Sequence, residues 1–228
     1  MDDVVYICRA GRNEELRYSL RSLRNFPHDR VWVVGGRPAW YAGRYVRVPP
    51  KPNKYEHGRA NLRAIVRNGD ISEGFVLFND DFFVIRSIEE LPVLHAGPLA
   101  ELVDKVQRFA PEARYTKMLA RTLEVLRGEG ISDPLSYNLH VPMRMEKAHV
   151  REALKFEGSP RSLVGNLFDY GGDFAEDVKV HLRQAGPMPS YKWKRGRSPF
   201  LSTNDQTFRE VWVGKLRDTF PKASLFEY

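Results

Sequence analysis

Two adjacent carboxylates follow a run of apolar residues in this sequence. Residues 75–78 read Phe-Val-Leu-Phe, Asn79, Asp80 and Asp81 come next, and apolar residues resume at Phe82. A short apolar run is typical of a strand buried on both faces, as in a parallel sheet covered by helices. Ligands of such sheets gather beyond the carboxyl ends of the strands, where two acids are costly unless a cation or hydrogen-bond donors compensate them. The pattern therefore predicts a metal-assisted site at a sheet edge.

The spacing of the oxygen ligands limits which of them share a cation. Side chains alternate between the two faces of a strand, so Asn79 and Asp81 can face one ion, whereas Asp80 joins them only if the chain has begun to turn. Mg²⁺ or Mn²⁺ suits oxygen ligands that leave positions open for phosphate and water. This arrangement resembles the Asp-x-Asp of GT-A glycosyltransferases. An aspartate that caps the next turn is the alternative interpretation.

Strand and helix patterns alternate around these residues. Asn13 can cap a helix in which Leu16, Leu20 and Leu23 form one apolar stripe. In order, the patterns predict a strand at 3–8, a helix at 14–26, strands at 30–34 and 45–48, and a helix at 61–68. The alternation predicts an α/β fold, a GT-A-like doubly wound and mostly parallel sheet.

The second half of the chain has a different texture. Residues 99–126 are helical by period and divided at Pro111, so we expect an inserted helical segment at about 98–130 that packs on the sheet or serves as a lid or acceptor platform. An extended segment at 136–141, helices at 146–156 and 205–220, and a loop at 187–199 complete the prediction.

Composition favours one catalytic domain over residues 1–228, since a chain of this length with 42% hydrophobic residues can bury one sizeable core. The single cysteine, Cys8, lies in an apolar run and excludes an intrachain disulfide. No basic leader precedes an apolar core at the N-terminus, and no apolar window has the length of a membrane span. We therefore expect a cytoplasmic protein.

The net charge of +7 favours anionic partners such as nucleotide diphosphates, nucleic acid or acidic lipid. Only residues 192–197, Lys-Trp-Lys-Arg-Gly-Arg, form a dense basic cluster with an aromatic residue inside it. Such a cluster can hold phosphates or a nucleic-acid strand, and a basic loop is an equal alternative.

Several segments in order resemble the Stealth family of sugar-phosphate transferases. They comprise 13–23, with its Glu-Leu-Arg-Tyr-Ser-Leu-Arg-Ser, then 30–34, 38–40, 61–65 and 71–75, the Asn-Asp-Asp of 79–81, the His-Val-Pro of 140–142, and 200–205 with 220–227. The resemblance implies a GT-A-like fold and a nucleotide sugar, UDP-linked, as donor. It also implies transfer of a hexose-1-phosphate to an acceptor hydroxyl with release of the nucleoside monophosphate.

The resemblance also implies roles for individual residues. Asp80, Asp81 and Asp205 would hold Mn²⁺ or Mg²⁺ and the diphosphate, Asp81 and Asp205 acting at the catalytic centre, and His140 would be a base or a phosphate ligand. A histidine among apolar neighbours suits a proton acceptor, and a buried structural histidine is the alternative. Only Arg161 stands before residues 162–168, which are poor in arginine, and that would suit transfer of the bare sugar.

Further polar residues are candidates for binding substrate. Arg12, Arg144 and Lys194 are possible phosphate contacts, Lys54 a contact for the donor base or sugar, and Asn61, Asn79 and Asn204 complete the set. The acceptor would be a glycan, a protein or a nucleic acid. Two rival functions remain open at this point, namely a glycosyltransferase that acts on modified DNA bases and a nucleic-acid-binding protein without enzymatic activity.

Overall fold

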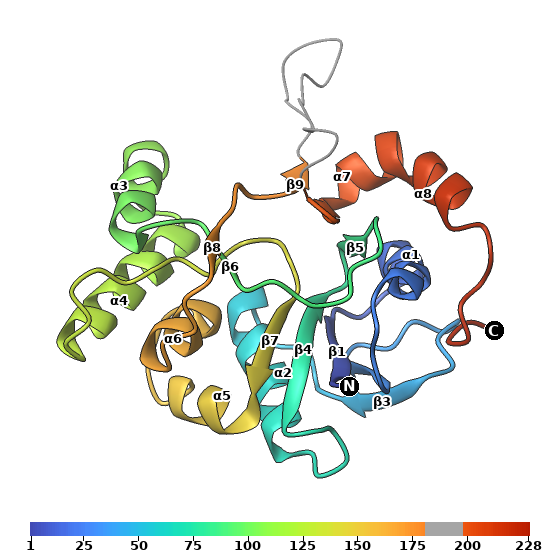
Figure 1. Cartoon of the computed structure of the whole chain (residues 1–228), viewed down its shortest axis with the longest axis horizontal. Coiled ribbons are helices and arrows are strands. Elements are labelled where there is room, and N and C mark those ends of the chain that lie inside the picture. Colours follow the sequence, from blue (N-terminus) through green and yellow to red (C-terminus); the bar gives the residue numbers. More distant parts are fainter. Residues whose placement is uncertain (181–197) are drawn as a thin grey trace.

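A mostly parallel five-stranded sheet forms the centre of the computed structural model, which describes residues 1–180 and 198–228 (Figure 1). The strand order is β3-β2-β1-β4-β7. The strands span β1 Asp3–Cys8, β2 Val31–Gly35, β3 Arg44–Arg47, β4 Gly74–Asn79 and β7 Met143–Glu146. The first four strands run parallel and β7 pairs antiparallel with β4. The predicted α/β fold with a mostly parallel sheet is confirmed.

The period-two alternation of the strands divides the core between the two faces of this sheet. Val5 and Leu77 point to a cluster that includes Leu62 and Ile65 of α2 (Lys54–Arg67). Tyr6 and its neighbours on the other face pack in a cluster with Leu16 and Leu20 of α1 (Glu14–Ser22). Burial on both faces explains the continuous apolar runs of β1 and β4.

The predicted helical insertion is a helix pair beside the sheet. It consists of α3 (Leu99–Phe109) and α4 (Arg114–Gly128), and the chain between them contains Pro111. Two shorter helices, α5 (Lys147–Ala153) and α6 (Pro160–Leu167), lie with α2 on the same face (Figure 1). Helix α2 begins at Lys54, seven residues before the predicted start, because Asn53 accepts hydrogen bonds from the backbone N–H groups of Tyr55 and Glu56.

The apolar residues after the two acids belong to a different sheet. Strand β5 (Phe82–Val84) pairs with β10 (Phe200–Thr203), which pairs with β9 (Lys179–Val180). Strand β4 ends at Asn79, so the two acids follow the end of a buried strand as predicted, and the chain turns at Asp80 and Asp81 and leaves the central sheet. A third sheet, of two strands, pairs β6 (Leu94–His95) with β8 (Asp173–Phe174).

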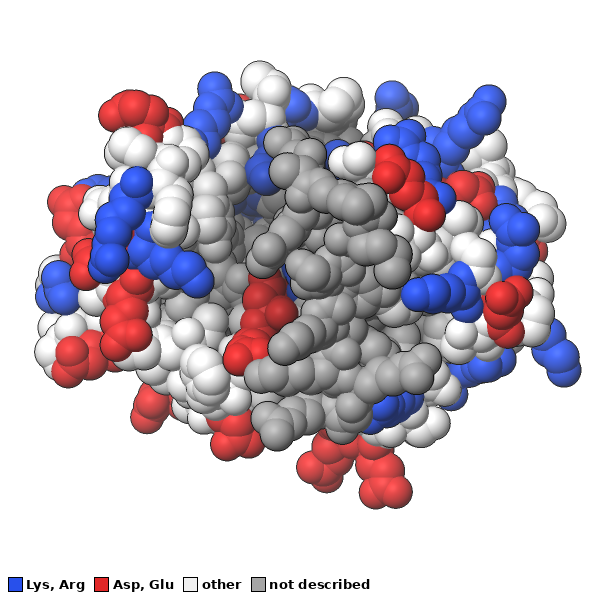
Figure 2. Space-filling model, turned by 90° about the horizontal axis from the view of Figure 1, so that it is seen from above, with Lys and Arg blue, Asp and Glu red and all other residues white. Residues whose placement is uncertain are grey.

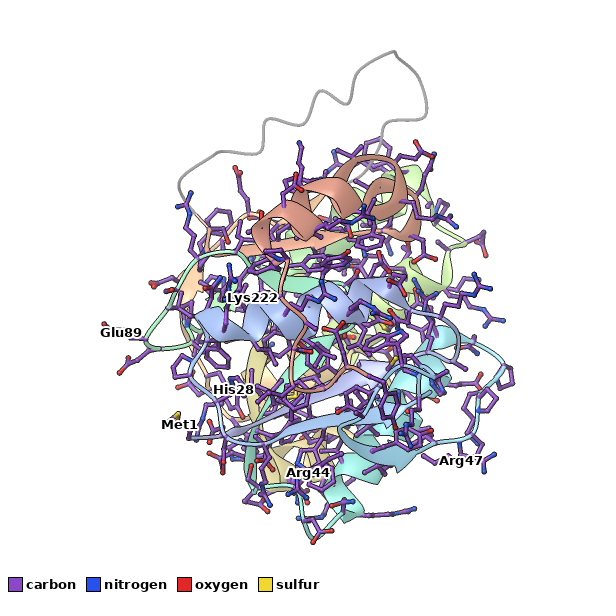
Figure 3. All side chains as sticks on the ribbon, turned by 90° about the vertical axis from the view of Figure 1, so that its right-hand side faces the viewer. Met1, His28, Arg44, Arg47, Glu89 and Lys222 are labelled. Carbon is purple, nitrogen blue, oxygen red and sulfur yellow. The ribbon has the colours of Figure 1, made fainter. Side chains whose placement is uncertain are left out.

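The last part of the described chain closes over the second sheet and returns to α1. A short helix α7 (Asp205–Thr207), a π-helical turn (Phe208–Trp212) and α8 (Val213–Thr219) replace the single predicted helix. Glu227 then accepts hydrogen bonds from Arg21 at 2.8 and 2.7 Å and forms an ion pair with Arg17. At the edge of the central sheet, Arg44 and Arg47 on β3 are exposed (Figure 3). No described helix is long and apolar enough to cross a bilayer.

Candidate active site

Asp80 and Asp81 form the turn between β4 and β5 and are held by different parts of the chain. The Asp80 carboxylate accepts a hydrogen bond at 2.6 Å from the amide of Asn13, in the loop between β1 and α1. The Asp81 carboxylate contacts the second sheet, accepting hydrogen bonds from Lys179 of β9 at 2.9 Å and Ser202 of β10 at 3.2 Å. The turn thus sits where the two sheets meet.

Asp205 reaches the same place from the far end of the chain. It is the first residue of α7, capped by Asn204, whose side chain accepts a hydrogen bond from the backbone N–H of Thr207. Arg9, one residue past β1, pairs with Asp205 at 3.4 Å. Helix α1 contributes Glu15, which accepts a hydrogen bond from Thr203 of β10 at 3.3 Å. Four carboxylates from three segments therefore gather beyond the carboxyl ends of β1 and β4.

These carboxylates line a cavity of about 620 Å³. Its wall also carries five basic side chains, Arg9, Lys54, Arg161, Lys179 and Arg209. A cavity of this size suits a small-molecule ligand, and its place beyond the ends of parallel strands is where α/β sheets bind ligands. Acids and bases in one cavity provide both cation ligands and phosphate contacts.

Crowding of negative charge perturbs two of the four carboxyl groups. Burial, followed by the charges of Asp80, Asp81 and Asp205, raises the pKa of Glu15 to about 8. Burial and the neighbouring Asp81 raise the pKa of Asp80 to about 6, although Asn13 and Arg9 act in the opposite direction. The acids are therefore only partly compensated by the cations beside them.

The raised pKa of Glu15 makes stability depend on pH in a defined direction. Between its ordinary value of 4.5 and about 8, the unfolded chain releases the proton of Glu15 while the folded chain keeps it. The free energy of unfolding should therefore fall as pH rises through this window. We expect Glu15→Gln to match the wild type near pH 4.5 and to exceed it in stability at pH 8, by on the order of 2 kcal/mol after allowance for solvent screening.

Urea unfolding of both proteins across this pH range, with divalent cations removed, measures the difference. Glu14→Gln is the matched control, since Glu14 is the exposed neighbour of Glu15 on the same helix, and it should show no comparable gain at pH 8. A stability difference between Glu15→Gln and the wild type that does not change with pH would contradict the predicted protonation of Glu15.

His140 and Asp177 form a hydrogen-bonded pair at the same cavity. Nδ1 of His140 lies 2.7 Å from one Asp177 oxygen, and the backbone N–H of His140 donates to the other oxygen at 3.0 Å. Burial would raise the pKa of Asp177, but the hydrogen bonds and charge of His140 outweigh it and hold the pKa below its usual value. A carboxylate at Nδ1 assigns the proton to that nitrogen and leaves Nε2 as the acceptor.

The half-buried Arg161 supports the loop that carries His140. Its guanidinium donates hydrogen bonds to the carbonyl groups of Tyr137 and Val141, at 3.0 and 2.6 Å. Burial lowers its pKa to about 10, against the opposing charge of Asp177. Arg161 is thus engaged in holding the segment on both sides of His140.

The structure brings most of the predicted site residues together. The cavity wall includes Lys54, Asn61, Asn79, Asp80, Asp81, His140, Asn204 and Asp205. Arg12 lines a neighbouring cavity of about 550 Å³ that shares Arg9, Glu15 and Asp205 with the first. The structure does not bring Arg144 there, since it pairs with Asp2 at 2.6 Å at the opposite end of β4. Lys194, with the basic cluster of 192–197, lies outside the described residues.

The cavity or supporting residues that were not predicted as site residues include Arg9, Glu15, His57, Asp177 and Lys179. Glu15 reads in the sequence as an acid in the first turn of a helix, where the helix dipole favours it. Asp177 and Lys179 precede and begin a strand of two residues, too short to show a pattern. In the sequence, the only indication of a site here is that Asp177 stands two residues before Lys179, next to an apolar segment.

Donor chemistry and geometry give different answers about a metal ion. Carboxylate and amide oxygens with uncompensated negative charge fit Mg²⁺ or Mn²⁺. However, no three His, Cys, Asp or Glu side chains within residues 1–180 and 198–228 are arranged as a metal-binding group. Asp80, Asp81 and Asp205 therefore share a cavity without forming a preassembled cation site, and Lys179 and Arg9 already neutralise two of them.

The sequence matches no family model and no curated protein. Among solved structures, the chain has a likeness to 4-diphosphocytidyl-2C-methyl-D-erythritol synthase, at a TM-score of 0.35 and 12% sequence identity. The alignment covers 73% of this chain and 84% of that chain. A likeness at this level supports no conclusion about function.

Proposed function

We propose that the protein is a transferase that moves a sugar-1-phosphate or a sugar from a nucleotide sugar to an acceptor hydroxyl. One observation carries this proposal. Acids from segments far apart in the chain line one cavity together with His140 and basic side chains, at the carboxyl ends of β1 and β4. The Stealth resemblance adds a donor, a UDP-linked sugar, and the sugar-phosphate form of the reaction. Phosphoryl transfer needs positioning and charge neutralisation above all, and the cavity offers groups for both.

His140 is the group best placed to accept the proton of the acceptor hydroxyl, since Asp177 occupies its Nδ1. In sugar-phosphate transfer, the acceptor oxygen bonds to the β-phosphorus, the bond from that phosphorus to the bridging oxygen breaks, and the nucleoside monophosphate leaves. In sugar transfer, the acceptor oxygen bonds to the anomeric carbon and the nucleoside diphosphate leaves. In both reactions the proton passes to Nε2 of His140.

Asp80 and Asp81 would hold a divalent cation in this proposal, with Asp205 and Asn79 nearby. Such a cation supplies positive charge to the donor diphosphate. Lys179 and Arg9 would contribute fixed positive charges at the same end of the cavity.

The nucleotide released identifies the reaction. We expect incubation with UDP-sugars and Mn²⁺ or Mg²⁺ to release UMP if sugar phosphate is transferred and UDP if the sugar alone is transferred, with loss of the reaction in EDTA. Chromatography of the nucleotides measures this. Failure of a broad panel of UDP-, GDP-, ADP- and CMP-sugars to release any nucleotide, with glycan and protein acceptors present, would refute the proposed function.

The rival functions on nucleic acid have less support. Figure 2 shows Lys and Arg side chains interspersed with Asp and Glu side chains over the coloured part of one face, without a single basic patch among the residues described there. The four carboxylates at the cavity would repel a phosphate backbone unless a cation intervened. A nucleic-acid acceptor remains one of the three acceptor classes that the proposal allows.

A further inference from the structure

Two buried polar atoms on one face of α2 have no hydrogen-bond partner among residues 1–180 and 198–228. They are Nδ1 of His57 and Oδ1 of Asn61. The two residues are four positions apart on the helix, so their side chains lie on the same side, and both line the cavity. Asn61 is 1% exposed. An unpaired buried polar group costs about 1–3 kcal/mol. Two such atoms at a cavity wall fit a ligand that supplies their missing hydrogen-bond partners.

Packing around Asn61 fixes the place of its carboxamide. Gly35 ends β2 with a φ of 118°, a conformation that favours glycine. A Cβ at this position would lie 3.1 and 3.2 Å from the amide nitrogen and oxygen of Asn61 and 2.3 Å from the carbonyl oxygen of Cys8. The amide is therefore packed against the ends of β1 and β2, and Asn61 is also part of the cavity wall.

Two tyrosines, Tyr55 and Tyr115, also line the cavity. Burial raises the pKa of both phenols, and the pKa of Tyr115 to about 12. His57 places Nε2 3.4 Å from the carbonyl oxygen of Cys8, which assigns the ring proton to Nε2 and makes Nδ1 an acceptor. Flat rings beside an unpaired carboxamide suit a planar heterocycle with N–H groups.

We propose that Asn61, supported by His57, binds the nucleobase of the donor. The inference rests on the proposed function and adds the end of the cavity at which the donor is recognised. A carboxamide pairs with any base edge that presents a donor beside an acceptor, as asparagine does with adenine in DNA complexes. Oδ1 of Asn61 accepts the base N–H, and the base then lies at α2 while the diphosphate extends towards Asp80 and Asp81.

Binding measurements separate this inference from the proposed function. Isothermal titration calorimetry would compare UDP, CDP, ADP and GDP with inorganic pyrophosphate, which lacks a base, in the presence of Mg²⁺. We expect the wild type to prefer one nucleotide over the others by at least 10-fold. Asn61→Asp should abolish that preference and weaken the preferred nucleotide about 10-fold or more, because a carboxylate offers no N–H, while pyrophosphate binding stays within twofold.

Two further variants keep the test decisive. His57→Leu removes the second unpaired atom without changing the more deeply buried Asn61, and it should weaken the preferred nucleotide but not pyrophosphate. Arg63→Ala, on the exposed face of α2, is the matched control and should bind every ligand as the wild type does. Thermal unfolding confirms that each variant is folded.

The outcomes are distinguishable. If the wild type binds a nucleotide and both Asn61→Asp and His57→Leu, folded, keep its affinity and preference, the nucleobase assignment is wrong while the proposed function stands. If the wild type binds no nucleotide, the proposed function fails and takes this assignment with it.

Discussion

Asp81→Asn is expected to lower kcat for nucleotide-sugar turnover by at least about 100-fold, the loss typical when one group that neutralises transition-state charge is removed. The substitution preserves shape and leaves an oxygen that still accepts hydrogen bonds from Lys179 and Ser202, so the fold should persist. What disappears is the negative charge that would hold a cation at the diphosphate. Steady-state rates of nucleotide release measure kcat, and calorimetry with Mn²⁺ measures cation binding.

The matched control for this variant is Asp70→Asn, an aspartate to asparagine change on an exposed turn before β4. It should leave both the rate and Mn²⁺ binding unchanged. An Asp81→Asn protein that keeps wild-type turnover would remove Asp81 from the catalytic centre. Reduced turnover with unchanged Mn²⁺ binding would keep Asp81 in catalysis but assign the cation elsewhere.

His140→Gln should reduce kcat by about 100-fold to 10,000-fold, the range for loss of a general base. Asp177→Asn should reduce kcat by about 10-fold to 100-fold with little change in KM, because asparagine no longer stabilises the charged imidazolium that forms on proton transfer. Asp177 acts as a positioning residue, through the 2.7 Å hydrogen bond to Nδ1. Steady-state rates measured from pH 5 to 9 check the reduction in kcat for each of the two variants.

A double-variant cycle distinguishes this role from a merely structural one. If Asp177 acts through His140, the variant that carries both substitutions should be no slower than His140→Gln alone. Asp173→Asn, on the exposed strand β8, serves as control and should keep full activity. Independent, additive losses would show that Asp177 contributes by some path other than His140.

The central sheet follows from the sequence because its cause is local. Apolar runs at β1, β2 and β4 and the cap at Asn13 are short-range signals, and each was confirmed. The two acids follow the end of β4 as predicted, and the apolar pattern resumes at Phe82 and Phe83. Nothing in that pattern shows that these residues pair with β10, more than 110 residues away.

The set of residues that form the site was harder to predict from the sequence, because it also depends on contacts between distant segments. Asp80 and Asp81 were found as acids at a strand end, a local property, and Asp205 through the Stealth resemblance; all three line one cavity. The role of Glu15 depends on Thr203, and that of Asp81 on Lys179 and Ser202, all distant in the chain. Arg144 was a candidate only as a cation near a strand, and its partner Asp2 is visible only once β1 and β4 are paired.

The different anchoring of Asp80 and Asp81 has a consequence for how the cavity can diversify. Residues adjacent in sequence usually share their surroundings, but here Asp80 depends on Asn13 and Asp81 depends on Lys179 and Ser202. A single substitution in β9 or β10 can thus alter the charge balance of one carboxylate and leave its neighbour as it was. The environments of the two carboxylates can evolve, or be engineered, by separate steps.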